Sequence, residues 1–194
     1  KAVDGYMDDA GDVNSAVGHR RWLLYPPLAA VGTGDAVGHR RANTLMIVGP
    51  GSTASGRANP EYVLFPPAGF YPKSLAPLSR RWSVSTASSN WNGVSVDVNG
   101  ERADITHTDT GPYGLATLVF QGPLIDWQGY DQSFAVVLSR DDQPFLEYSV
   151  TFFDPLMDGA PICASFTITV GASCVNNCDI GGTFSLTTLY VNNQ

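Results

Sequence analysis

The stretch Val94-Ser-Val-Asp-Val-Asn-Gly100 places valine at every second position and then ends in an Asn-Gly pair. Successive side chains of a strand point to opposite faces of a sheet, so this alternation predicts an antiparallel strand with one buried face. Asn-Gly adopts the positive backbone angles that a tight hairpin turn requires. The stretch therefore predicts a strand over residues 94–98 that is followed by a turn.

Similar segments recur between residues 60 and 155. Short apolar or alternating runs, separated by turns rich in Gly, Pro and Asp, lie at residues 82–85, 103–106, 115–120, 133–138 and 146–153. Asp141-Asp142 predicts the hairpin turn that joins the last two of these strands. Several short strands at this spacing predict a β-sandwich, which we expect to be immunoglobulin-like.

The first 49 residues have a different pattern, which predicts a small α+β segment. Residues 1–13 are acidic and predict a loop. One short helix is expected over residues 15–24, with Asn14 as its N-cap and Pro26-Pro27 preventing its continuation. Two short strands are expected after it, at residues 31–34 and 43–48.

The fold class predicted for the whole chain is mainly β. Residues 50–59 are rich in Gly and Ser and predict a linker between the α+β segment and a sandwich over residues 60–155. Residues 156–194 predict a C-terminal β-hairpin that carries a disulfide. With 20 glycines and 13 prolines among 194 residues, the composition agrees with such a turn-rich architecture.

Charge and motifs exclude several classes of function. The formal net charge of -7 argues against nucleic acid or an anionic membrane as partner, because phosphates require a basic surface. The chain contains no apolar run long enough for a membrane span. It also lacks a Gly-x-Ser-x-Gly elbow, a His-Glu-x-x-His pair and a P-loop. We therefore predict no catalytic residues and favour a non-enzymatic protein.

The cysteines indicate an extracellular protein. Cys163, Cys174 and Cys178 cluster near the end of a chain that is rich in Ser, Thr, Asn and Gly. Cys174 and Cys178 are the predicted disulfide, Cys163 with Cys174 is the alternative pairing, and zinc would need a further ligand. Because the sequence begins at Lys1 without an apolar leader, we expect that a signal peptide has been removed.

One stretch resembles a known family. Asn14-Ser-Ala-Val-Gly-His-Arg-Arg-Trp-Leu-Leu-Tyr-Pro-Pro27, followed by Val31-Gly-Thr-Gly34, resembles the second half of a bacterial-type CAP domain, of the secreted cysteine-rich, antigen 5 and pathogenesis-related superfamily. The β-rich extension of some such domains is similar to further segments, so that the resemblance covers residues 14–155. These segments are Phe65-Pro-Pro-Ala-Gly-Phe-Tyr-Pro72, Arg81-Trp-Ser83, Tyr113-Gly114 and Tyr148-Ser-Val-Thr-Phe-Phe-Asp-Pro155.

The resemblance implies a cavity built from two histidines and two acids, and it places His19, next to Arg20, as the later histidine. The earlier histidine and the acids have no matching positions, so we expect either a processed fragment or a trimmed scaffold. The predicted helix would then present an apolar face with no upstream half to cover it. We expect self-assembly or another protein chain to complete this core, and a filament if copies join head to tail. The residues of this face are Val17, Trp22, Leu23 and Leu24.

Other residues are weaker candidates for binding. The four tryptophans, at positions 22, 82, 91 and 127, could form a surface that stacks on a carbohydrate. Trp22 and Trp82 are expected in the core, whereas Trp91, between Asn90 and Asn92, is predicted to be exposed and is the preferred candidate. The arginine pairs 20–21, 40–41 and 80–81 predict internal salt bridges, with anionic glycans as the alternative. An acidic cluster could hold calcium, the alternative to a solvated acidic arm. Its members are Asp4, Asp8, Asp9 and Asp12.

Together these observations predict a secreted, non-catalytic, CAP-like structural or interaction protein without a cofactor, such as a subunit of a cell surface or filament. Two alternatives stay open. In the first, His19 is part of a metal-dependent enzyme or binding site that another chain completes. In the second, the chain is a carbohydrate-binding module.

Overall fold

The computed structural model describes residues 2–36, 42–49, 51, 53, 60–87, 90–109 and 114–155. The chain divides into two units, Lys1–Pro155 and Leu156–Gln194, and all of the described residues belong to the first. Several predictions therefore lie outside the described residues. They are the C-terminal hairpin, Cys163, Cys174, Cys178, most of the linker and the pair Arg40-Arg41.

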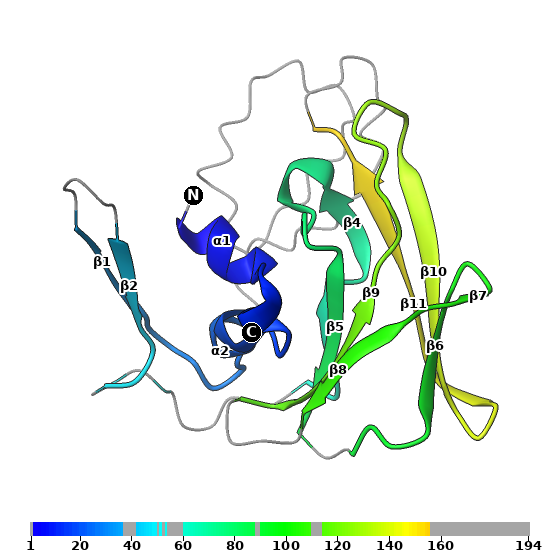
Figure 1. The fold of residues 1–194 in the computed structure, drawn as a ribbon, viewed down its shortest axis with the longest axis horizontal. Coiled ribbons are helices and arrows are strands. Elements are labelled where there is room, and N and C mark those ends of the chain that lie inside the picture. The colour runs from blue at the N-terminus through cyan, green and yellow to red at the C-terminus, as the bar shows by residue number, and fades with distance from the viewer. Residues whose placement is uncertain are drawn as a thin grey trace, which may run out of the picture. The chain divides into compact units, whose positions relative to one another are not determined.

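Two sheets contain most of the described strands of the first unit (Figure 1). The five-stranded sheet contains, in spatial order, β4 (Gly69–Pro72), β11 (Gln143–Phe153), β10 (Gln132–Arg140), β6 (Val94–Val98) and β7 (Glu101–Arg102). The four-stranded sheet contains β3 (Val63–Phe65), β5 (Arg81–Thr86), β9 (Ala116–Gln121) and β8 (Ile105–Asp109). Within these two sheets, β4 pairs with β11 in parallel and the other pairs are antiparallel. The predicted mainly β fold is confirmed, while an immunoglobulin-like topology stays a prediction.

Strands with a clear local pattern form where the sequence predicts them. Val94, Val96 and Val98 are buried and the residues between them are half-buried, as the alternation requires. The turn that follows has positive φ at Asn99 and Gly100. Asp141-Asp142 forms the predicted turn between β10 and β11, also with positive φ. The strands β3 and β4 were not predicted, because prolines interrupt their pattern; both lie at a sheet edge, where proline is tolerated.

Both sheets contribute to one apolar core around Trp82 of β5. The indole ring of Trp82 lies 6.1 Å from Phe120 of β9, 6.0 Å from Phe134 of β10 and 5.8 Å from Phe152 of β11, measured between ring centroids. Trp82 therefore links the inner faces of the two sheets. Trp91 also belongs to this core and is 3% exposed, so the prediction that it is exposed is wrong. Its neighbours Asn90 and Asn92 are exposed, but its own side chain is buried, three residues before β6 begins.

The N-terminal segment is more helical than predicted. Residues 1–13 are not simply a loop, because α1 (Ala2–Asp8) and the 3-10 turn η1 (Asp12–Asn14) form there. The next helix, α2 (Gly18–Leu23), starts later than expected, and Val17 rather than Asn14 occupies its N-cap position. The two predicted strands form a hairpin of β1 (Gly32–Ala36) and β2 (Ala42–Met46). None of the helices in the described part of the chain is long and apolar enough to cross a membrane.

The packing of Trp82 generates a prediction about Gly122, which follows β9. A Cβ atom on Gly122 would lie 2.3 Å from Nε1 of Trp82, a rigid and buried ring. We expect Gly122→Ala to lower the free energy of unfolding by about 1–3 kcal/mol through overpacking, as measured by urea denaturation.

The matched control is Gly5→Ala in α1, where the added methyl group meets nothing within 4 Å. The same chemical change should there raise the free energy of unfolding by about 0.5–1 kcal/mol, because alanine favours a helix more than glycine does. Equal effects of the two substitutions would contradict the packing around Trp82.

Candidate functional site

Arg20 of α2 lies in the interior, with 1% of its surface exposed. Its Nε donates to the carbonyl oxygen of Met7 at 2.6 Å, and one terminal nitrogen donates to that of Asp8 at 3.1 Å. The other terminal nitrogen donates to the carbonyl oxygen of Arg81 at 2.7 Å and to Oγ of Ser83 at 3.2 Å. A single guanidinium group thus joins the end of α1 to the strand β5.

The Arg20 guanidinium also lies over the ring of Phe65, 4.2 Å from its centroid. Burial lowers the pKa of Arg20 to about 10, while the nearby carboxylates of Asp9 and Asp8 oppose that shift. The group therefore remains a cation at neutral pH. Burial also raises the pKa of Tyr71, on β4, to about 12, so that this phenol stays protonated beside the arginine. The hydroxyl group of Tyr71 donates to the carbonyl oxygen of Leu75 at 3.3 Å.

Asp9 and His19 form the second polar contact of the segment. Asp9 is 1% exposed, and one carboxylate oxygen accepts from the backbone N–H groups of His19 at 2.9 Å and Arg20 at 3.4 Å. Its other oxygen lies 2.7 Å from Nδ1 of His19. The imidazole is 48% exposed and its ring lies 5.1 Å from that of Tyr6. With Nδ1 held by a carboxylate, Nε2 is the nitrogen that could carry a proton or bind a ligand.

Asp9 therefore supplies the N-terminal cap of α2 from a position outside the helix. It occupies the left-handed region, with φ of 50°, which aspartate tolerates better than most residues. The sequence offered no signal for this role, because a capping residue is expected at the N-cap position itself. The position of Asp9 depends on the turn between α1 and α2.

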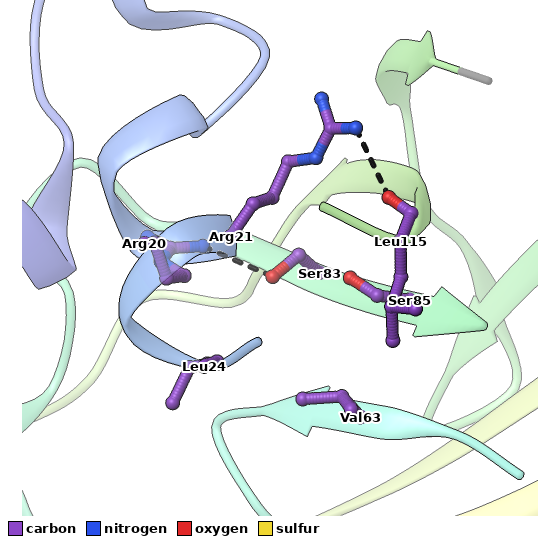
Figure 2. Close-up of a pocket in the computed structure, with 7 residues that line it drawn as sticks. All are labelled: Arg20, Arg21, Leu24, Val63, Ser83, Ser85 and Leu115. Atoms are coloured by element: carbon purple, nitrogen blue, oxygen red, sulfur yellow. Dashed lines mark hydrogen bonds between the residues drawn. The ribbon is translucent and has the colours of Figure 1, made fainter. Parts of the chain in front are cut away.

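A small pocket lies between α2 and the four-stranded sheet (Figure 2). Its lining residues are Arg20, Arg21, Leu24, Val63, Ser83, Ser85 and Leu115. Figure 2 shows Arg21 extending away from Ser83 toward the carbonyl oxygen of Leu115, to which it donates at 3.0 Å. The space within is about 10 Å³, the size that one water molecule needs. Such a volume does not accommodate an organic substrate.

The described arginine pairs have only some of the predicted partners. Arg21 forms the expected salt bridge, with Asp109 at 2.5 Å. Arg20, Arg80 and Arg81 instead donate to backbone carbonyl oxygens: Arg80 to Gly122 at 2.9 Å, and Arg81 to Asp9 at 2.5 Å. The described arginines thus bind groups within the chain, as predicted. Most of the acceptors, however, are backbone carbonyl oxygens rather than carboxylates, and no sequence pattern identifies them.

Two members of the acidic cluster have different partners. Asp8 accepts from the backbone N–H of Ser79 at 2.8 Å, and Asp9 turns toward His19. Within the described ranges, no group of three or more acidic, His or Cys side chains is arranged to hold a metal ion. Calcium binding by Asp4, Asp8, Asp9 and Asp12 stays an untested prediction.

Comparison of the chain with protein-family models, with curated proteins and with solved structures finds no match. The CAP resemblance therefore depends on the quoted motifs, and membership of that family stays a prediction.

The burial of Arg20 predicts a large effect of a small chemical change. Arg20→Lys keeps the charge but cannot reach acceptors on both α1 and β5 with one planar group. We expect the free energy of unfolding to fall by about 3 kcal/mol, since each hydrogen bond to a charged group contributes ~1.5–3 kcal/mol. Thermal and urea denaturation measure this loss.

Arg102→Lys is the control, because Arg102 pairs with Asp97 at 3.2 Å on the surface. It should change the free energy of unfolding by less than about 1 kcal/mol. A similarly small change for Arg20→Lys would show that the guanidinium does not join the segments.

The contact between Asp9 and His19 predicts unequal effects of removing its two members. Asp9→Ala removes a buried cap and should cost about 2–4 kcal/mol, whereas His19→Ala removes one partly exposed hydrogen bond and should cost about 1–2 kcal/mol. Equilibrium denaturation of both variants tests this order. A greater loss for His19→Ala would mean that the histidine, rather than the aspartate, positions α2.

Proposed function

We propose that this chain is a secreted, non-catalytic structural or interaction protein, in which a CAP-like segment is attached to a β-sandwich, and that it is a subunit of a cell-surface or filamentous assembly. The observation that carries the proposal is the burial of Arg20. In this reading the motif His19-Arg20-Arg21 serves to hold the scaffold together. The pocket beside the motif offers room for one water molecule, which favours a scaffold over a substrate site.

Exposed apolar side chains around the N-terminal hairpin support assembly with another chain. Val31, Met46 and Val48 lie at or beside β1 and β2 and are 47%, 60% and 70% exposed. Val3 of α1 is 56% exposed, and Tyr6 of the same helix donates to the side chain of Asn43 in β2 at 2.7 Å. Apolar groups on neighbouring elements favour contact with a second surface. A second copy of this chain is the partner we propose.

The face of α2 that was predicted to be uncovered gives only weak support for self-assembly. Val17 is fully buried, while Trp22, Leu23 and Leu24 are half-buried. Leu24 lines the pocket together with Val63 of β3 and Leu115, next to β9. The β-rich extension thus covers part of the helix within one chain, so the proposal of self-assembly depends on the hairpin surface.

Native mass spectrometry at micromolar concentration tests the assembly. We expect species that are multiples of the 20.7 kDa chain, and we expect Val48→Glu to shift them toward the single chain because a charge would enter the contact. Val13→Glu is the matched control, since Val13 is exposed on η1, outside the hairpin. A lone 20.7 kDa species at every concentration would contradict self-assembly.

A metal-dependent binding site is the second candidate, and one observation favours it. His19 is held at Nδ1 by a buried carboxylate and remains half-exposed, the arrangement that orients metal-binding histidines. Residues of another chain would have to complete the coordination. Elemental analysis of protein dialysed against zinc and then against buffer separates the candidates: retained zinc that is lost in His19→Ala supports the second, and its absence in both proteins supports the first.

A further inference from the structure

A buried lysine holds the loop that connects β9 to β10. Lys73, in the 3-10 turn η2 (Lys73–Leu75), is 3% exposed. Its Nζ donates to the carbonyl oxygens of Gly129 at 2.6 Å and Tyr130 at 2.7 Å. Lysine is almost never fully buried unless its charge is paired. Here the ammonium group contacts two successive carbonyl oxygens, and so it fixes the path of residues 129–130.

The same loop has further ties. The side-chain oxygen of Gln132 accepts from the backbone N–H of Asp126 at 2.8 Å. A carboxylate oxygen of Asp126 accepts in turn from the backbone N–H of Gln128 at 3.0 Å. Residues 126–132 are therefore held by three side chains: Lys73, Asp126 and Gln132. A loop fixed in this way loses little conformational entropy when it binds a ligand.

This restrained loop exposes two aromatic residues. Trp127 is 46% exposed and Tyr130 is 89% exposed. Neither ring belongs to the apolar core around Trp82, so packing in this core does not account for the two aromatic residues. Exposed aromatic rings on a fixed backbone are typical of binding surfaces, because these side chains supply contact area at low entropic cost.

We propose that Trp127 and Tyr130 form a binding surface for neutral sugar rings. The C–H face of a pyranose is apolar and packs against an aromatic ring, while its hydroxyl groups need polar partners at the edge. Three exposed polar side chains lie within or beside the loop and can supply acceptors. They are Asp126, Gln128 and Asp131.

Charge argues against an anionic sugar. The chain has a net charge of -7, and two of the three polar side chains at the loop are acidic. Uronic acids or sulfated sugars would be repelled, whereas hydroxyl groups donate well to carboxylates. Trp91 was predicted to stack on a carbohydrate because asparagines lie on both sides of it. It is buried in the core and cannot contact a ligand. The sugar surface deepens the proposed interaction function, since it names one class of ligand.

Isothermal titration calorimetry with neutral hexasaccharides of glucose, xylose, mannose and N-acetylglucosamine tests the proposal. We expect at least one of them to bind the full chain, and we expect Trp127→Ala and Tyr130→Ala each to weaken that binding about tenfold or more, as a central aromatic contact does. Because the Tyr130 ring is almost fully exposed, its removal should leave the fold and the melting temperature unchanged.

Phe145→Ala is the matched control. Phe145 is another exposed aromatic residue, but it lies on β11 just after the turn at Asp141-Asp142, at the opposite end of β10 from the loop (Figure 1). This variant should bind the sugar as the natural chain does. The proposal is overturned if none of the four hexasaccharides binds, or if Phe145→Ala weakens binding as much as Trp127→Ala. It is likewise overturned if Tyr130→Ala changes only the oligomeric state, which would identify a contact between copies.

The two proposals can fail separately. A chain that binds a hexasaccharide but stays at 20.7 kDa would contradict assembly and support the sugar surface. A chain that assembles but binds none of the four hexasaccharides would support assembly and contradict the sugar surface.

Discussion

The guanidinium group of Arg20 is the contact on which the arrangement of the N-terminal segment depends. It is the point where α1, α2 and β5 meet, and four hydrogen bonds together with the ring of Phe65 surround it. Removing a cation from water costs several kcal/mol, and that cost is offset only where the surrounding acceptors have good geometry. The carbonyl oxygens at the end of α1 are such acceptors, because they have no partners within the helix. The short helix and the buried charge therefore stabilise each other.

The same physical device appears at Lys73. In both places a buried cation donates to backbone carbonyl oxygens, and in both it holds a segment that local sequence would leave loosely defined. Arg20 acts on the seven-residue helix α1, and Lys73 acts on the loop that precedes β10. In an acidic chain, cations are scarce, and these two are placed where one side chain orders several backbone groups. Arg20 thereby connects elements of the scaffold, and Lys73 fixes the backbone of a loop that exposes two aromatic rings.

Because Arg20 is used to hold the scaffold together, self-assembly and sugar binding are proposed at other parts of the fold than the motif that resembles a family. His19 and Arg21 flank the central arginine, and Asp9 and Asp109 hold Nδ1 of His19 and one terminal nitrogen of Arg21 in place. The space beside them holds about one water molecule. Among the described residues, the hairpin of β1 and β2 and the loop with Trp127 and Tyr130 both expose large apolar side chains. The exposed side chains on both surfaces do not belong to the apolar core.

Local patterns were enough to predict the strands that are buried on one face. The valines of β6 and the turn residues Asn99-Gly100 and Asp141-Asp142 carry their information within a few positions, because alternation and positive φ are properties of neighbouring residues. The beginning of α2, the formation of α1 and the burial of Trp91 were not predictable in this way. Asp9 caps α2 from outside the helix, Arg20 reaches Arg81 across 61 positions, and the asparagines beside Trp91 suggest water while its ring enters the core. Each of these depends on segments that meet only when the chain folds, since a buried polar group selects its partner by distance in space and not along the sequence.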